Sequence, residues 1–495
     1  MNFAVEPMTT ALLLAIFGVL LATCVLLKRS IDRIGIPVAL LFLVLGMLAG
    51  SEGLGKIAFE DYQLAFRLGT VALIIILFDG GLNTKWTSVS KGIAPASILA
   101  TFGVIFTAAL TAVGAYLLGL PWPLALLLGA VVSSTDAATV FAVLRGSRLL
   151  LRPKLNATLE LESGLNDPMA VILTITLTEA LLTGTAQLWH LLYSVPLELL
   201  IGAAIGVSIG YAARFSLAKA RLTTAGLYPI LTLAAAFLAF GTATIAHGSG
   251  FLAVYVCALI LGNGHLPARG SLIRVHDTIA WLSQIGMFLM LGLLVFPSRL
   301  LDAAPTGLGI ALILTFIARP VAVALCLFPF RFPPTQLAYI GWVGLRGAVP
   351  VILAVFPVLA KAPGADEIFN IVFFVVVANA ILPGSTVRYL TRRWNLSLTQ
   401  RPTPAAALEI HSANPLGGEL ASFHIHPSLA VCNATLAEIT FPPDAAAVLL
   451  VRGGTLLPCR GDTRLLEDDH IYIYYKPEAQ GLIELLFGSP QDGEG

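Results

Sequence analysis

The stretch Glu-Leu-Glu-Ser-Gly-Leu-Asn-Asp-Pro at residues 160–168 places carboxylates inside a long apolar run. An ionised side chain at the centre of a bilayer costs about 3 kcal/mol or more, so acidic residues there usually have a function. At about 100° per residue, Ser163, Asn166 and Asp167 share one helical face, and Glu162 lies one turn before Asn166. That face offers hard oxygen ligands for a small cation or a proton. A solvated charge cluster on a loop is the alternative, and the apolar run that follows disfavours it.

Asp167 is the residue that we expect to carry the chemistry. A carboxylate in a membrane cavity can hold a proton or a monovalent cation, but it cannot hold both well at once. If each occupant favours crossing, one cation moves for each proton that moves the other way. Because Asn166 does not titrate, the site carries the same charge in both directions. The sequence therefore predicts electroneutral exchange.

Two other apolar spans are interrupted, at Ser133-Ser134-Thr135-Asp136 and at Gly344-Leu345-Arg346-Gly347-Ala348-Val349-Pro350. Paired broken helices in corresponding halves of a membrane protein are typical of transporters with inverted repeats. Unwound backbone frees N–H and C=O groups for ions, which lipid-exposed backbone could not tolerate. Ordinary kinking would explain the Gly and Pro residues, but not an Asp in one break and an Arg in the other.

The charged residues of the breaks suggest distinct roles. Thr135 and Asp136 can add a hydroxyl, a carboxylate or backbone carbonyls to the site, or Asp136 can instead cap the half-helix that follows it. Arg346 would repel a cation, so we interpret it as a counter-charge paired with Glu162. For Arg319, a second cation in an apolar span, capping a break or forming a structural pair is favoured.

Other polar residues give weaker signals. Asp79 lies either near the pathway or at the end of a span, and His247 and His276 lie near span ends, where interface roles are more common than proton relays. The five cysteines lack CxxC spacing, so the sequence predicts no disulfide framework and no metal centre. We therefore expect no cofactor beyond the transported ions.

The composition is that of a polytopic membrane protein. Of 495 residues, 57% are hydrophobic and 12% charged, with mean hydropathy +0.88, whereas soluble domains carry about 25% charged residues. The net charge of +1, without a basic block, gives no sign of a nucleic-acid partner. About thirteen apolar runs are long enough to span a bilayer: 8–27, 36–50, 66–83, 92–118, 121–144, 156–183, 190–214, 226–246, 249–263, 275–297, 307–329, 335–360 and 367–390.

Loop charges predict the orientation. Lys and Arg gather in the loops after odd-numbered spans, for example Arg145, Arg148, Arg152 and Lys154 after the fifth, while the alternate loops nearly lack them. By the positive-inside rule, the N-terminus is outside and the C-terminal tail is cytoplasmic. We expect a multi-pass protein of the plasma (inner) membrane.

Composition also divides the chain. Residues 1–394 form the transmembrane domain, the polar and Pro-containing residues 395–415 form a linker, and residues 416–495 form a small cytoplasmic α/β domain. In that domain, Ala446–Arg452 and Thr455–Arg460 flank Gly453-Gly454 as a hairpin. Ser422–His426 and His470–Tyr475 are further expected strands, and Glu478–Phe487 is an expected helix.

Three stretches together resemble bacterial monovalent cation–proton antiporters, the family that includes NhaP-type sodium/proton exchangers and the animal exchangers. They are Ser134-Thr135-Asp136, the Glu-Ser-x-x-Asn-Asp-Pro pattern at 162–168, and Gly344–Ala348; Gly248–Tyr255 is similar to a fourth recurrent segment. The resemblance covers about 390 residues, essentially the whole membrane part.

This resemblance implies roles for individual residues. Asp167 binds the ion and the proton, Ser163 and Thr135 are ligands, Asn166 supports the site, and Glu162 pairs with Arg346. It also implies a homodimer formed through outer helices, with six-helix transport bundles that move against the dimer domain.

The tail is similar to the C-terminal half of domains that regulate potassium conductance (RCK domains). With the membrane part it resembles cell-volume-regulation antiporters, which favour potassium over sodium. The tail lacks a GxGxxG nucleotide cradle, so it either binds a small nucleotide at a dimer interface or only dimerises.

Two other function classes compete with a K⁺/H⁺ or Na⁺/H⁺ antiporter. A proton-coupled solute symporter would need more polar groups, and the spans offer few Asn, Gln or Trp. A ligand-gated channel should have rings of like charge or a repeated carbonyl filter, and neither is evident. The resulting prediction is a secondary transporter, not an enzyme.

Overall fold

The computed structural model describes residues 6–488 apart from residues 35–36, 58, 87–89, 91, 147–148, 185–187, 221, 223, 225, 265, 267–268, 399–417 and 428. It contains two compact units. The helical unit comprises Met1–Leu266 and Ser271–Leu398, and the C-terminal unit comprises Thr399–Gly495 with Pro267–Gly270.

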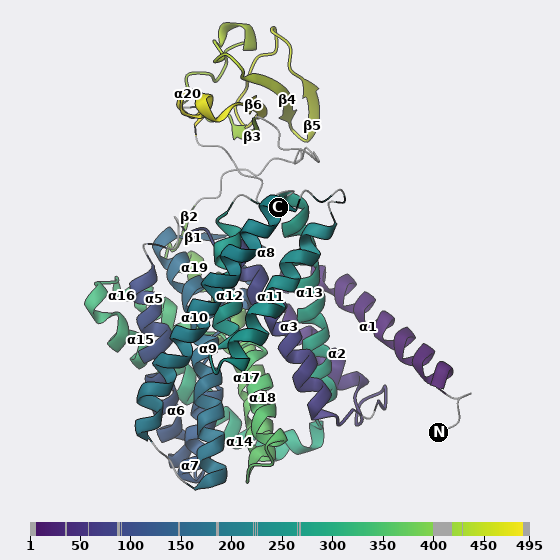
Figure 1. The fold of residues 1–495 in the computed structure, drawn as a ribbon, viewed down its shortest axis with the longest axis vertical. Helices are drawn as coiled ribbons and strands as arrows, with labels where there is room; N and C mark the ends of the chain where they lie inside the picture. The colour runs from purple at the N-terminus through teal and green to yellow at the C-terminus, as the bar shows by residue number, and fades with distance from the viewer. Residues whose placement is uncertain are drawn as a thin grey trace. The chain divides into compact units, whose positions relative to one another are not determined.

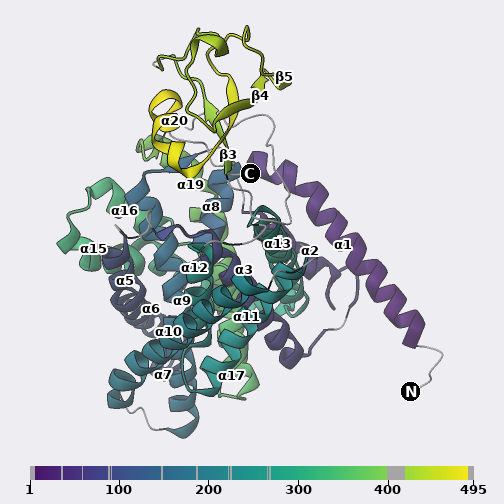
Figure 2. The same ribbon diagram turned by 45° about the horizontal axis from the view of Figure 1, so that its top comes forward.

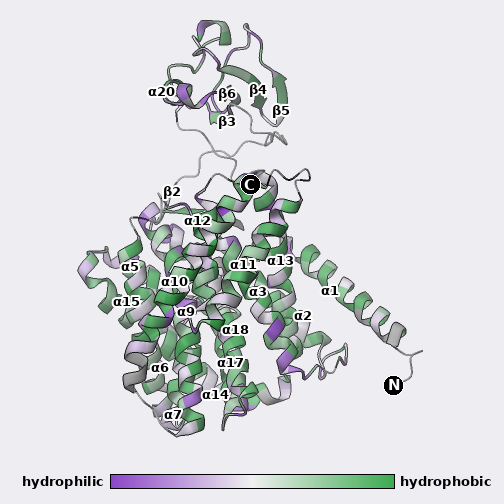
Figure 3. Cartoon of the chain, viewed as in Figure 1, coloured by the Kyte–Doolittle hydropathy of each residue, from purple (hydrophilic) through white to green (hydrophobic). Residues whose placement is uncertain are grey.

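The helical unit is a bundle of apolar helices (Figures 1 and 3). Within the described residues, eight continuous helical stretches are long and apolar enough to cross a membrane, and four shorter apolar helices accompany them. Each of the thirteen expected spans has a helical counterpart there, so the polytopic helical fold is confirmed. The helices are α1 (Glu6–Ile34), α2 (Val38–Ala49), α3 (Tyr62–Asn83), α5 (Ile93–Ile98), α6 (Val104–Leu117), α7 (Trp122–Val131), α8 (Ala137–Gly146), α9 (Pro153–Thr183), α10 (Leu188–Lys219), α11 (Leu227–Ile245), α12 (Gly250–Gly262), α13 (Arg269–Leu293), α14 (Pro297–Ile313), α15 (Arg319–Leu327), α16 (Pro334–Trp342), α17 (Val349–Leu359), α18 (Ala365–Asn379) and α19 (Ser385–Arg393).

The two predicted interruptions are present. One separates α7 from α8 and the other separates α16 from α17. The breaks touch directly, because the backbone N–H of Asp136 donates to the carbonyl of Leu345 at 2.8 Å. Unwound backbone at membrane depth needs hydrogen-bond partners within the protein. Here one N–H of the first break and one carbonyl of the second break bond each other.

Among the described residues of the unit, three pairs of consecutive α-helices are joined by a π-helical turn, so that each pair forms one continuous helix. These turns are Leu99–Gly103 between α5 and α6, Leu314–Ala318 between α14 and α15, and Ala380–Gly384 between α18 and α19. Single π turns are frequent at functional sites, because the extra residue in the turn redirects the side chains around it.

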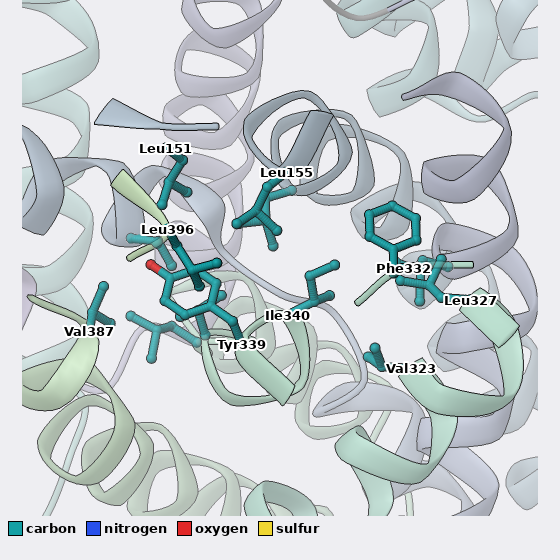
Figure 4. Close-up of a cluster of buried hydrophobic side chains, with 14 of the residues drawn as sticks. Leu151, Leu155, Val323, Leu327, Phe332, Tyr339, Ile340, Val387 and Leu396 are labelled. Atoms are coloured by element: carbon teal, nitrogen blue, oxygen red, sulfur yellow. The ribbon is translucent and has the colours of Figure 1, made fainter. Parts of the chain in front are cut away.

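A buried apolar cluster packs α8, α9 and α15 against the second break and the end of the helical unit (Figure 4). At one side of it, β1 (Leu150–Leu151) pairs antiparallel with β2 (Ser397–Leu398). Strand β2 falls inside the segment 395–415 that was expected to be a linker. The rest of that segment, 399–415, lies outside the described residues.

The C-terminal unit is a four-stranded antiparallel sheet with one short helix (Figure 2). Gly453 and Gly454 both have positive φ, as a tight hairpin turn requires, so the predicted hairpin is confirmed. Ile483 and Phe487 of the helix are buried in the core of the sheet, and the salt bridge Arg452–Asp469 closes at 2.7 Å. The strand order is β3 (Glu419–His424), β6 (His470–Tyr475), β4 (Ala446–Arg452), β5 (Thr455–Pro458), and the helix is α20 (Gln480–Phe487).

Candidate ion-binding site

Helix α9 supplies the central carboxylate. Asp167 is 5% exposed and Asn166 is fully buried. Within the described part of the chain, Oδ1 of Asp167 and Oδ1 of Asn166 are buried without a hydrogen-bond partner. Pro168 follows inside the helix, and because it has no N–H it leaves the carbonyl of Gly164 without its usual helical donor. The helix thus presents several unsatisfied oxygen acceptors close together.

The first break binds to this face of α9. The Ser163 hydroxyl donates to the carbonyl of Thr135 at 3.0 Å, and the Asn166 side-chain amide donates to the Thr135 hydroxyl at 2.5 Å. The structure therefore brings together Ser163, Asn166 and Thr135, three of the predicted site residues. Ser134, which is not among the predicted ligands, lies next to the Asp167 carboxylate.

Asp136 caps the half-helix α8. Its carboxylate accepts from the Thr139 backbone N–H at 3.2 Å and from the Thr139 hydroxyl at 2.6 Å. Of the two roles left open by the sequence, the structure contains the capping one, which places a negative charge at the positive end of a helix dipole. The carboxylate also packs against Gly347, where any Cβ would collide with it. Asp136 still repels the charge of Asp167.

Arg346 compensates the opposite half-helix. Its Nη1 donates to the carbonyl of Ser133 at 2.7 Å and to the carbonyl of Ser134. These carbonyls follow the C-terminus of α7, which is the negative end of that helix dipole. The Arg346 guanidinium of the second break thus offsets the negative dipole end of α7, the helix that leads into the first break.

The buried ion pair differs from the expected one. Glu162 contacts Arg319, with Oε1 and Nη2 2.6 Å apart and both side chains 3% exposed or less. Glu162 precedes Asp167 by five positions, about 140° around the helix, so it faces α15 and not the break. The Glu162 carboxylate attracts the Arg346 guanidinium electrostatically but forms its ion pair with Arg319. Arg319 therefore forms a structural ion pair, as expected, and its partner is Glu162. The expected pairing of Glu162 with Arg346 is wrong.

The remaining candidates lie elsewhere. Asp79, near the end of α3, accepts a hydrogen bond from the Asn83 side chain at 3.1 Å. His276 is fully buried against Phe78 and contacts the Thr232 hydroxyl at 2.7 Å. Glu160 accepts from Thr84 at 2.8 Å, a contact between α9 and the end of α3 that sequence spacing could not indicate.

Comparison with known proteins identifies the family. Residues 18–393 match the family described as sodium/hydrogen exchanger, transmembrane. The chain belongs to the sodium/hydrogen exchanger family. It is therefore a multi-pass cation/proton antiporter and not an enzyme.

Individual relatives of this exchanger agree. It is 40% identical to the K(+)/H(+) antiporter NhaP of Alkalimonas amylolytica over 94% of this chain and 81% of the relative. It is 38% identical to the K(+)/H(+) antiporter NhaP2 of Shewanella oneidensis over 96% of this chain and 83% of the relative. Its fold is similar to the sodium proton antiporter MjNhaP1 from Methanocaldococcus jannaschii at pH 8, with TM-score 0.65 and 25% identity over 77% of this chain and 99% of that one.

The buried ion pair of the exchanger generates a stability prediction. Glu162→Gln should lower the free energy of unfolding by about 3–5 kcal/mol, because it leaves the Arg319 charge buried without a counter-charge. The double variant Glu162→Leu/Arg319→Met should recover most of that loss, since apolar side chains of similar volume can replace a buried pair. Thermal unfolding of the detergent-solubilised protein measures both, with the exposed Asp302→Asn as control. A single variant as stable as the unchanged protein would contradict the prediction.

Proposed function

We propose that this exchanger is an electroneutral K⁺/H⁺ antiporter in which K⁺ and H⁺ compete for Asp167. The observation that carries the proposal is the buried carboxylate oxygen Oδ1 of Asp167, which has no hydrogen-bond partner in the described part of the chain. Beside it stand Oδ1 of Asn166, which has no hydrogen-bond partner in the described residues, and the Thr135 hydroxyl, which accepts from the Asn166 amide and keeps a second lone pair. The Ser163 hydroxyl, which donates to the Thr135 carbonyl, is a further oxygen of the same face. Alternating access would expose this one site to each side in turn.

The charges around the breaks support a one-for-one exchange. Three carboxylates, Asp136, Glu162 and Asp167, face two guanidiniums, Arg319 and Arg346. The set carries one net negative charge, which one proton or one monovalent cation neutralises. Both loaded forms then cross with the same charge, and a charged site would be expensive to move through a low-dielectric barrier.

The preference for K⁺ over Na⁺ rests on relatives. The two described above are named K(+)/H(+) antiporters and are 40% and 38% identical, whereas the Na(+)/H(+) antiporter NhaS2 of Synechocystis sp. is 28% identical. Loop charges support an outside N-terminus and a cytoplasmic C-terminal unit in the inner membrane. A homodimer follows from the family resemblance.

The first test removes the titrating group. Asp167→Asn should abolish proton release from proteoliposomes on addition of K⁺ or Na⁺, because the amide is uncharged and cannot take up or release a proton. Dequenching of a pH-sensitive dye measures the exchange, and the unchanged protein should half-saturate at lower K⁺ than Na⁺. Asp302→Asn, an exposed acid in α14, should behave like the unchanged protein. Normal exchange by Asp167→Asn would refute the proposed site.

The charge balance predicts the electrical behaviour. On a solid-supported membrane, a K⁺ jump should give no transport current under conditions in which the dye reports full exchange. The reason is that the same net charge crosses in each direction. A current that grows with protein density and disappears in Asp167→Asn would mean unequal stoichiometry.

We further propose that the C-terminal unit regulates transport, as an RCK C-terminal-like domain that dimerises or binds a small nucleotide. The place where the C-terminal unit joins the helical unit supports a regulatory role. Strand β2 directly precedes the C-terminal unit, and its partner β1 is part of the connector between α8 and α9, which carry the site. Arg152 strengthens this contact by donating to the carbonyls of Asn395 and Leu396, each at 3.1 Å. A displacement of β2 would reach both helices of the site.

A reversible cross-link tests this route. Leu150 and Leu398 are opposed in the β1–β2 pair, so cysteines there are close enough for a disulfide. In the full chain, oxidation of Leu150→Cys/Leu398→Cys should slow exchange by at least about fivefold, the lower end of typical coupling between sites, and reductant should restore it. Leu150→Cys alone should not respond to oxidant, which controls for the native cysteines. Equal rates in the oxidised and reduced double variant would rule out transmission through β2.

A further inference from the structure

A buried amide side chain holds the second break in place. Asn379, at the end of α18, is 2% exposed. Its Oδ1 accepts from the backbone N–H of Arg346 at 2.9 Å, and its Nδ2 donates to the Thr315 hydroxyl at 3.3 Å. Thr315 is 4% exposed and lies in the π turn Leu314–Ala318, while the π turn Ala380–Gly384 begins directly after Asn379. Neither residue belongs to the three sequence stretches that carry the family resemblance.

The bond to Arg346 replaces a missing helical partner. In the unwound segment between α16 and α17, the N–H of residue 346 has no carbonyl one turn back to accept it. A buried donor left without a partner costs about 1–3 kcal/mol. The side chain of Asn379 supplies the acceptor, and its other end is fixed by Thr315. The break is thereby tied to two neighbouring helices at their π turns.

The position of residue 346 decides the position of the first break. Leu345 accepts the backbone bond from Asp136, and the Arg346 guanidinium holds the carbonyls of Ser133 and Ser134. The next residue, Gly347, packs against the Asp136 carboxylate. Three consecutive residues therefore set the path of the segment that carries Thr135, and Asn379 anchors the middle one.

We propose that Asn379 and Thr315 are positioning residues for the cation site: through the Arg346 backbone they fix the α7–α8 break against α9. They do not touch the ion. This inference rests on the proposed site at Asp167. Asn379 and Thr315 are uncharged and lie outside the breaks. By this inference they control how well the oxygen ligands of the site fit a monovalent cation.

A purely structural role would have different consequences. If Asn379 only satisfied a buried N–H, its loss would lower stability and the amount of folded protein, but the folded fraction would bind K⁺ as before. If Asn379 positions the site, the KM for K⁺ rises while the maximal rate changes little, since the titrating Asp167 is intact. The split between KM and maximal rate separates the two roles.

The experiment uses the full chain in proteoliposomes with K⁺ series at fixed pH. Thr315→Val keeps the side-chain shape but removes the hydroxyl, and should raise the KM for K⁺ by roughly fivefold, the value of one net hydrogen bond. Asn379→Ala should raise it by roughly tenfold or more, because both bonds are lost. Thr315→Ser restores the hydroxyl and should return the KM to within about twofold of the unchanged protein, a small part of one net hydrogen bond.

A matched control removes another buried hydrogen bond nearby. The Tyr339 hydroxyl on α16 bonds the Thr391 hydroxyl on α19 at 2.7 Å, both buried. Tyr339→Phe should lower the thermal unfolding temperature but leave the KM for K⁺ unchanged. Unchanged KM values in both Thr315→Val and Asn379→Ala, with Asp167→Asn inactive, would overturn the positioning role and leave the site standing. Exchange by Asp167→Asn would instead overturn the site itself.

Discussion

Helices that stop inside a membrane leave exposed backbone dipoles, and the compensation of those dipoles is the constraint on which this structure depends. The carbonyls of Ser133 and Ser134 follow the C-terminus of α7 and lie outside its helical hydrogen bonds, and Arg346 of the other break donates to both. Helix α8 begins with N–H groups that lack helical acceptors, and the Asp136 carboxylate accepts from one of them, that of Thr139. Because the backbone of Asp136 also bonds that of Leu345, neither break could keep its path without the other. A transporter can retain unwound backbone at this depth only because each end finds an opposite charge or a backbone partner.

This compensation leaves one carboxylate available. Asp136 is committed to the α8 cap and Glu162 to Arg319. Of the three, Asp167 alone forms neither an ion pair nor a helix cap in the described chain, and its Oδ1 is buried without a hydrogen-bond partner. The same two guanidiniums that stabilise the breaks and the ion pair also lower the net charge of the region to a value that one small cation or proton balances. In the proposed mechanism the structural charges and the transported charge are parts of one electrostatic balance, so a substitution at one of these charged residues is expected to change ion binding.

The helices that frame the breaks reach the site through a few polar contacts among apolar packing. The π turn Leu314–Ala318 carries Thr315, which accepts a hydrogen bond from Asn379 of α18, and the residue after the turn, Arg319, pairs with Glu162 of α9. On the other side, the apolar cluster around Leu155, Tyr339 and Leu396 joins α9 to the strand that precedes the C-terminal unit. Polar anchors fix direction, since a hydrogen bond has a preferred geometry, while the apolar cluster supplies most of the burial energy. The assignment to the sodium/hydrogen exchanger family fits an architecture in which a small site is held by long-range contacts.

The sequence by itself determined the thirteen helical segments, the two breaks, the hairpin of the C-terminal unit and the grouping of Ser163, Asn166 and Asp167 on one face. These follow from hydropathy, Gly/Pro placement and helical periodicity, which are local properties of the chain. Only the tertiary structure decided that Glu162 pairs with Arg319, that Asp136 caps α8, that Arg346 lies on the carbonyl end of α7, and that Asn379 anchors Arg346. The contacts of Glu162, Arg346 and Asn379 join residues distant in sequence, and the cap by Asp136 is one of the two roles that the sequence left open. Such choices depend on how helices are rotated and packed, and a linear pattern of residue types does not contain that information.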